Sequence, residues 1–133
     1  MIYLLDTNIC IDLIRRRPAR VLIELQHCSP GDVGMSAITL AELEFGIYKS
    51  RTPDQNKLAL AEFAAPLEIL PFDDLAAARY GELRALLERK GQPIGSMDML
   101  IAAHALSRGL TLVTNNEREF RRVPGLRITN WDG

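Results

Sequence analysis

The chain has 133 residues, of which 47% are hydrophobic and 25% are charged, a composition typical of one folded domain rather than of a disordered chain. We therefore expect a single domain over residues 1–133. The formal net charge of −1 gives no overall basic signature for nonspecific nucleic-acid binding, although a local patch could still meet a polyanion. No apolar run approaches the roughly 20 residues of a membrane span, and no secretory signal is evident. Two cysteines without metal or disulfide spacing suit a reducing cytoplasm.

Short apolar runs alternate with helical patterns along the whole chain. Five strands are predicted, over Ile2–Leu5, Val33–Ser36, Leu67–Pro71, Leu110–Val113 and Leu126–Ile128. Seven helices are predicted, over Ile9–Arg16, Pro18–His27, Ala37–Tyr48, Asp54–Ala65, Asp73–Lys90, Ser96–Ser107 and Glu117–Arg121. Thr7 or Asn8, Asp73 and Ser96 are the expected helix caps. Because parallel strands need crossover connections, this alternation predicts a mostly parallel sheet with helices on both faces.

The first acid of the chain, Asp6, directly follows the predicted strand Ile2–Leu5. A carboxylate is rarely buried unless it is paired or binds a cation, so Asp6 either caps the next helix or belongs to a site. Ligands of parallel α/β sheets bind outside the carboxyl ends of the strands. Asn115 and Asn116 follow another predicted strand, so they are expected at the same edge of the sheet.

Three further acids can reach that edge. Glu42 interrupts an apolar helical segment, Asp98 lies in the first turn of the Ser96–Ser107 helix, and Glu119 follows the asparagine pair. Each alone has an ordinary explanation, such as a solvated helix residue for Glu42 or a favourable helix-dipole interaction for Asp98. Together they predict several carboxylates at one edge, where like charges either share a proton or hold a cation.

The type of cation follows from the ligands available. The two histidines, His27 and His104, are isolated, so the set offers oxygen ligands, which favour Mg²⁺ or Mn²⁺ over zinc. Such an ion suits phosphodiester hydrolysis, because it orients water, withdraws charge from the phosphorus and stabilises the leaving oxygen.

Four blocks of sequence resemble the PIN-domain family and, within it, the VapC toxins of bacterial toxin–antitoxin pairs. The blocks are LLDTN, SAITLAELEFGI, GQPIGSMDMLIAAHALSRGL and LVTNNEREFRRVPGLRITNW, and the resemblance extends from Met1 to about Trp131. It implies a three-layer PIN-like α/β domain. It also implies a metal-dependent endoribonuclease that cuts structured RNA, commonly a tRNA anticodon loop or ribosomal RNA, and so inhibits translation.

The resemblance also assigns roles to residues. Asp6, Glu42 and Asp98 match the acids that hold Mg²⁺ or Mn²⁺, which would activate water for in-line attack and leave a 5′-phosphate and a 3′-hydroxyl. Many members carry a fourth acid where this chain has Asn116, so either Asn116 or Glu119 would complete the catalytic set, and the number of metal ions stays open. The surrounding small polar residues are Thr7, Asn8, Ser36, Thr39, Thr114 and Asn115.

The resemblance further implies partners. Family members are usually homodimers bound by a VapB antitoxin, whose C-terminal segment lies across the toxin groove and whose N-terminal part binds operator DNA. DNA binding would therefore come through the partner. Candidate contacts to RNA phosphates are the arginines Arg15, Arg16, Arg17, Arg20, Arg118, Arg121 and Arg122.

Two other classes of protein remain as alternatives. A phosphotransferase that forms an aspartyl-phosphate at Asp6 would need a second acid or base close behind and a lysine near a strand end. Residue 8 is an asparagine, and Lys49, Lys57 and Lys90 are not near strand ends. A catalytically inactive binding module would be expected to lack part of the acidic set, which is complete in this chain.

Overall fold

The computed structural model describes residues 1–132, and its centre is a five-stranded sheet in the order β3-β2-β1-β4-β5 with all four pairings parallel. The strands are β1 (Tyr3–Leu5), β2 (Val33–Ser36), β3 (Glu68–Leu70), β4 (Thr111–Val113) and β5 (Ile128–Thr129). The helices are α1 (Thr7–Arg15), α2 (Ala19–Gln26), α3 (Ala37–Lys49), α4 (Pro53–Ala64), α5 (Asp74–Arg89), α6 (Ser96–Arg108) and α7 (Glu117–Phe120). The described residues include no helix that is long and apolar enough to cross a membrane.

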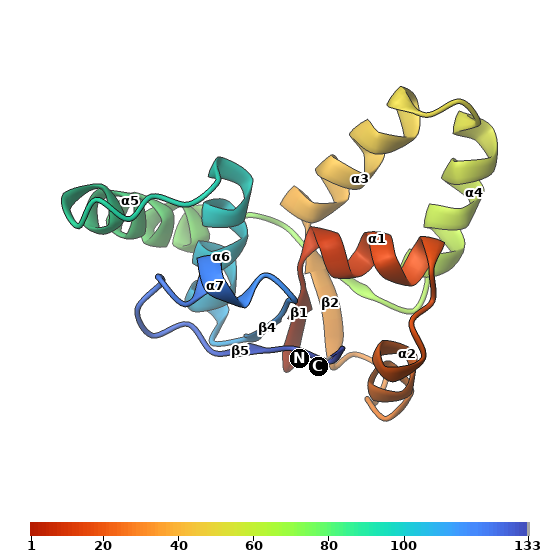
Figure 1. The fold of residues 1–133 in the computed structure, drawn as a ribbon, viewed down its shortest axis with the longest axis horizontal. Coiled ribbons are helices and arrows are strands. Elements are labelled where there is room, and N and C mark those ends of the chain that lie inside the picture. The colour runs from red at the N-terminus through yellow and green to blue at the C-terminus, as the bar shows by residue number, and fades with distance from the viewer. Residues whose placement is uncertain (133) are drawn as a thin grey trace.

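Two hydrophobic cores lie on opposite faces of the sheet, because successive side chains of a strand point to opposite sides. Leu4 of β1 belongs to the core beneath α5 and α6, whereas the next residue, Leu5, belongs to the core beneath α1–α4. Leu112 and Val113 of β4 divide in the same way. Figure 1 shows the two groups of helices on either side of the strands. The three-layer α/β architecture expected from the sequence is therefore confirmed.

The first residues of the helices bring polar side chains to one edge of the sheet. The backbone N–H of Asp6 donates to the carbonyl of Val113 at 3.0 Å, so the ends of β1 and β4 are held side by side. Helix α1 begins directly after β1, and α3 begins directly after β2. The carboxyl ends of three neighbouring strands therefore meet where these helices start, at the edge predicted to carry the site.

The structure corrects two of the predicted caps and confirms one. Asp6, not Thr7 or Asn8, caps α1, because its Oδ1 accepts from the N–H of Ile9 at 2.9 Å. Gly95 occupies the cap position of α6, because Ser96 already lies in the first turn. Asp73 caps α5 as predicted, accepting from the N–H of Ala76 at 3.0 Å.

Candidate active site

Asp6 is a buried carboxylate at the end of β1, with only 2% of its surface exposed. Burial raises its pKa to about 6, and the nearby charges of Asp12 and Glu42 add to this rise, while hydrogen bonds from Thr114 and Ile9 oppose it. Asp6 is thus a helix cap that also lies near other acids, and its membership of a functional site stays a prediction.

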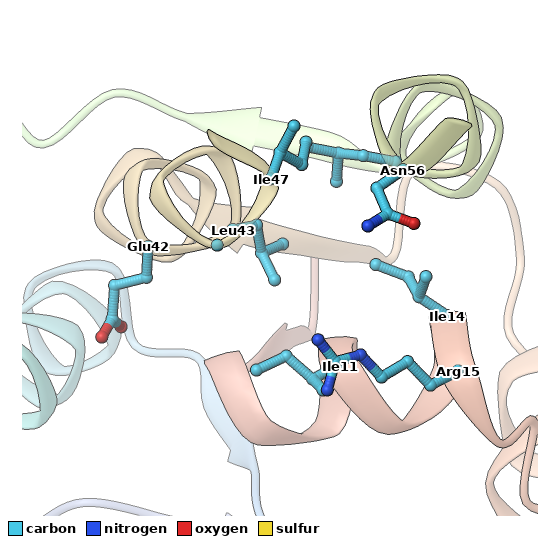
Figure 2. Close-up of a pocket in the computed structure, with 9 residues that line it drawn as sticks. Ile11, Ile14, Arg15, Glu42, Leu43, Ile47 and Asn56 are labelled. Carbon is cyan, nitrogen blue, oxygen red and sulfur yellow. The ribbon is translucent and has the colours of Figure 1, made fainter. Parts of the chain in front are cut away.

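Glu42 reaches the same edge from the second turn of α3. Its carboxylate accepts a hydrogen bond from the Thr7 hydroxyl at 2.6 Å, and the hydroxyl of buried Thr39 lies 3.3 Å from that of Thr7. These contacts join the start of α1 to α3. Glu42 also stands at one end of a groove between α1, α3 and α4, with its carboxylate turned away from the apolar side chains there (Figure 2).

Asp98 and Glu119 form a hydrogen-bonded pair beside this edge. Burial and the Glu119 carboxylate raise the pKa of Asp98 to about 7, and the charges of Asp6 and Glu42 raise it further. The pKa of Glu119 is lowered, mainly because the backbone N–H of Gly95 donates to its Oε1 at 2.8 Å. Two carboxyl groups can share a hydrogen bond only if one of them carries a proton, which the pKa values assign to Asp98.

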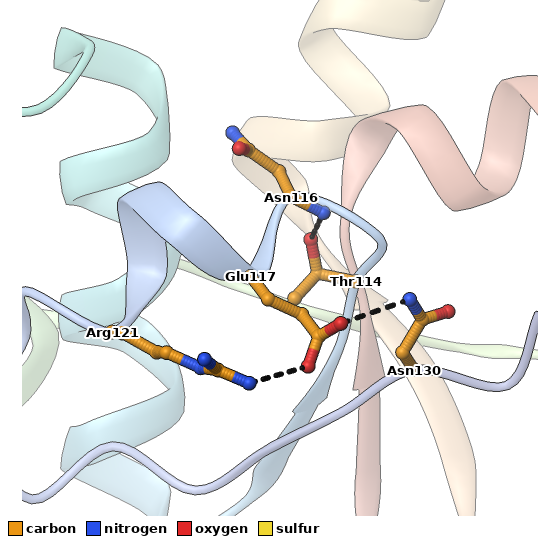
Figure 3. A network of polar contacts seen from close by, with 5 residues as sticks. All are labelled: Thr114, Asn116, Glu117, Arg121 and Asn130. Carbon is orange, nitrogen blue, oxygen red and sulfur yellow. Dashed lines mark hydrogen bonds and ion pairs between the residues drawn. The ribbon is translucent and has the colours of Figure 1, made fainter. Parts of the chain in front are cut away.

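The side chains of the two adjacent asparagines after β4 contact different parts of the molecule. Asn116 donates from Nδ2 to Glu119 at 3.3 Å, and its backbone N–H donates to Thr114 at 2.9 Å (Figure 3). Asn115 is exposed and donates to Asp12 on α1 at 3.4 Å, so its side chain contacts α1 instead of the paired carboxyl groups. Of the two, Asn116 is the one bonded to an acid of the cluster.

Ser36 and Asn8 do not contact the carboxylates through any hydrogen bond in residues 1–132. The Ser36 hydroxyl is fully buried, accepts from the N–H of Ile38 at 3.0 Å and lies 2.7 Å from Nδ1 of His104. It therefore fixes the start of α3 against α6. Asn8 is exposed on the first turn of α1.

The acidic cluster suits a divalent cation by its chemistry. Its ligands are oxygens, and burial together with the neighbouring carboxylates raises the pKa values of Asp6 and Asp98, an unfavourable arrangement of acids that a bound cation would relieve. Residues 1–132 nevertheless hold no group of three His, Cys, Asp or Glu side chains already arranged to bind a metal ion. The oxygen ligands of the cluster still fit a divalent cation by their chemistry.

Three of the predicted phosphate-binding arginines have different surroundings in the structure. Arg121 pairs with Glu117 at 3.2 Å, and the same glutamate accepts from Asn130 (Figure 3). Arg122 donates to the carbonyl of Pro93 at 2.9 Å, so it holds the loop before α6. Arg15 instead lines the groove between α1, α3 and α4, near Ile11 and away from Glu42 (Figure 2).

Sequence reasoning missed two contributors. Gly95 supplies the backbone N–H that holds Glu119, and its missing side chain leaves space beside Asp98 Oδ2 and Glu119 Oε1, which would lie 3.5 and 3.6 Å from a Cβ. Asp12 adds negative charge next to Asp6. No local pattern indicates either contribution, because Gly95 is distant from Glu119 in the sequence and Asp12 follows Asp6 by six residues, which is not a spacing of neighbouring helix positions.

Comparison with known proteins identifies the fold family of this arrangement. The family model of the PIN domain matches residues 3–126. The chain belongs to the PIN-domain family.

Relatives within the PIN-domain family are similar in sequence to this chain over nearly their whole length. Ribonuclease VapC2 of Rickettsia felis is 45% identical over 133 residues, which cover 99% of each chain. The tRNA(fMet)-specific endonuclease VapC of Shigella flexneri is 45% identical over 129 residues, covering 97% of each. These likenesses confirm the predicted enzyme class, an endoribonuclease of the VapC type.

Solved structures of VapBC complexes contain chains with the same fold as this one. The chain matches the structure of DNA-bound VapBC from Salmonella typhimurium with a TM-score of 0.95 and 44% identity over 98% of each chain. It also matches the structure of VapBC2 from Rickettsia felis bound to a DNA fragment from its promoter. The TM-score is 0.92 and the identity 43%, over 99% of this chain and 100% of that chain. The predicted PIN-like fold is confirmed.

Proposed function

We propose that the chain is the toxin of a toxin–antitoxin pair, which cuts tRNA in the cytoplasm with Mg²⁺ or Mn²⁺ and is neutralised by a VapB-type antitoxin. The acidic cluster of Asp6, Glu42, Asp98 and Glu119 at the carboxyl edge of the sheet carries this proposal. Hydrolysis of a phosphodiester needs a site that holds cationic charge next to a polyanion, and this cluster has the oxygen ligands for it.

Each residue has a distinct part in the proposed site. Asp6, Glu42 and Asp98 would hold the ion, which when bound would polarise water and the scissile phosphate. Thr7 orients the carboxylate of Glu42, and Thr114 that of Asp6. Asn116 and the Gly95 N–H hold Glu119 beside Asp98, so Glu119 fills the fourth acidic position through its contact with Asp98.

The names of two relatives direct the choice of substrate. The Shigella flexneri and Salmonella typhimurium relatives, each 45% identical, are named tRNA(fMet)-specific endonucleases. We therefore propose tRNA as the substrate class and initiator tRNA as the first species to test, with the anticodon loop as the expected position of the cut.

The groove between α1, α3 and α4 supports the proposed antitoxin. It is lined by the apolar side chains of Ile11, Ile14, Leu43, Ile47 and Leu60, with Arg15 and Asn56 among them and Glu42 at one end (Figure 2). A helical or extended segment with an apolar face fits this lining, and a basic residue of that segment could pair with Glu42. The solved relatives are VapBC complexes, two of them bound to DNA, so we propose the same assembly for this chain, with DNA bound through the antitoxin and with homodimeric toxin.

The first experiment is cleavage of a total tRNA pool by the purified chain, with Mg²⁺, with Mn²⁺ and with EDTA. Asp98→Asn, purified identically, controls for contaminating ribonuclease, because it keeps the shape of the side chain and removes the carboxyl group that would hold the metal ion. We expect discrete fragments that require both the metal ion and Asp98, and end-mapping would then identify the cut.

Other results would contradict parts of the proposal. Equal cleavage by Asp98→Asn would mean contamination or a wrongly placed site. Cleavage of ribosomal RNA but not of tRNA would overturn the substrate class and leave the nuclease in place.

A further inference from the structure

Helix α3 exposes an aromatic face immediately beyond the acidic cluster. Phe45 and Tyr48 are each 68% exposed, although aromatic side chains of this size usually bury most of their surface. On the opposite side of the helix, Leu43 and Ile47 are buried in the core. The exposure of both rings therefore reflects the orientation of α3 and marks a surface available to a ligand.

Two lysines accompany these rings. The ammonium group of Lys49 lies 5.6 Å from the ring centroid of Phe45, and that of Lys57, from α4, lies 5.9 Å from the ring centroid of Tyr48. We call Phe45, Tyr48, Lys49 and Lys57 the α3–α4 face. A pairing of aromatic rings with cations matches single-stranded nucleic acid, whose bases stack and whose phosphates attract positive charge.

The position of this face connects it to the proposed chemistry. Phe45 follows Glu42 by three residues, a spacing that puts both side chains on neighbouring positions of the helix surface. Lys49 follows Glu42 by seven residues, or about 10 Å along the helix axis. Figure 1 shows α3 running away from the sheet edge, with α4 returning beside it. A strand of RNA that leaves the acidic cluster along α3 would therefore pass over these rings.

We propose that the α3–α4 face holds unpaired nucleotides of the RNA substrate by stacking bases on Phe45 and Tyr48, with Lys49 and Lys57 contacting phosphates. This inference rests on the proposed ribonuclease function and adds a substrate-binding surface to it. A second copy of the chain is the competing occupant. It is disfavoured because lysines are depleted at protein–protein interfaces, whereas lysines cover both rings here.

The test compares variants in the cleavage of the tRNA pool used above. Phe45→Ala, Tyr48→Ala and the double variant remove the rings, whereas Phe45→Tyr and Tyr48→Phe keep them. Leu58→Ala is the matched control, because Leu58 is an exposed apolar residue of α4, at 62%, without an aromatic ring. Each ring deletion is expected to raise KM about tenfold and to leave kcat within about twofold, because stacking of a base contributes on the order of 1–3 kcal/mol. The conservative variants and Leu58→Ala are expected to have a KM within about twofold of the wild-type value.

The substitution Phe45→Trp provides a direct signal. In an Asp98→Asn background the added indole is expected to lose fluorescence when tRNA is added, because a stacked base quenches it, and Trp131 is only 8% exposed. Lys49→Gln with Lys57→Gln is expected to lower the slope of log affinity against log salt by about 1–2.

Three results would overturn the inference. If wild-type chain cleaves tRNA and the double ring variant has the same KM, the face does not bind substrate, and the proposed function stands. If the double variant instead changes from dimer to monomer in sedimentation and recovers full activity at high protein concentration, the occupant is a second copy. If the wild-type chain neither cleaves nor binds any RNA, the proposed function fails together with this inference.

Discussion

Helices α1 and α5 begin with the same local feature and differ in everything around it. Asp6 and Asp73 each accept a hydrogen bond from the N–H three residues later, at 2.9 and 3.0 Å. Asp6 is buried among other acids, with a pKa raised to about 6, whereas Asp73 is partly exposed at the start of a helix away from the cluster. A capping aspartate is therefore informative about chemistry only through the acids that the tertiary fold gathers around it.

The largest expected difference between these two positions is in catalysis. Asn caps helices about as well as Asp, so Asp6→Asn and Asp73→Asn both keep the cap and remove only a charge. We expect Asp6→Asn to lower kcat for tRNA cleavage on the order of a hundredfold or more, as loss of a group that stabilises charge in a transition state does elsewhere. Asp73→Asn should stay within about twofold of wild type. Equal losses in both variants would show that the cap, and not the charge, is what activity requires.

The next largest effect is on stability as a function of pH and concerns His104, which contacts both the start of α3 and the residue before the cap of α5. It is fully buried, contacts Ser36 at the start of α3, and packs edge-to-face on Phe72, the residue before Asp73. Burial lowers its pKa from 6.5, and the charge of Arg108 lowers it further, while Asp73 opposes the shift. The folded state therefore favours the neutral ring. The corresponding stability is fully present above pH 6.5 and is lost as pH falls through the folded-state pKa.

We expect this loss to reach up to about 2 kcal/mol at pH 5, measured by urea unfolding of wild type against His104→Gln. Acids with raised pKa are present in both proteins, so the difference between the two curves isolates the histidine. Asp73→Asn should steepen the loss, because it removes the carboxylate that supports the charged ring. Parallel curves for wild type and His104→Gln between pH 7.5 and 5 would contradict the prediction.

The smallest effect separates capping from catalysis. Asp73→Ala removes a cap and should lower the free energy of unfolding by about 1 kcal/mol, while kcat stays unchanged. Chemical denaturation and the tRNA assay on the same preparation test both statements. A stability loss with a parallel fall in kcat would mean that the start of α5 supports the site after all.

The fold followed from the sequence because its signals are local. Apolar runs such as Val33–Ser36 and Leu110–Val113 alternate with helical patterns, and this alternation predicts a parallel sheet, although it does not give the order of the strands. Element ends were less accurate. The predicted cap of α1 was wrong, because Asp6, Thr7 and Asn8 are all good caps and only the surrounding backbone selects Asp6.

The site was harder to predict, because its contacts join segments distant in sequence. Asp6 could be placed from the strand that precedes it. The contact of Asp98 with Glu119 depends on how the loop before α6 meets the segment after β4, with Gly95 donating to Glu119 across 24 positions. The opposite directions of Asn115 and Asn116 likewise depend on the turn after β4, which identical neighbouring residues cannot reveal.

Cys10, one helical turn beyond Asp6, offers a way to measure how often the core beneath α1 becomes exposed to solvent. Its thiol is fully buried, and burial together with the charge of Asp6 raises its pKa, so almost no reactive thiolate is present in the closed state. Cys28, the other thiol, is partly exposed. In a Cys28→Ser chain, the rate of alkylation would therefore report how often α1 separates from the sheet, and a slower rate after addition of a divalent cation would show that cation binding stabilises the start of that helix.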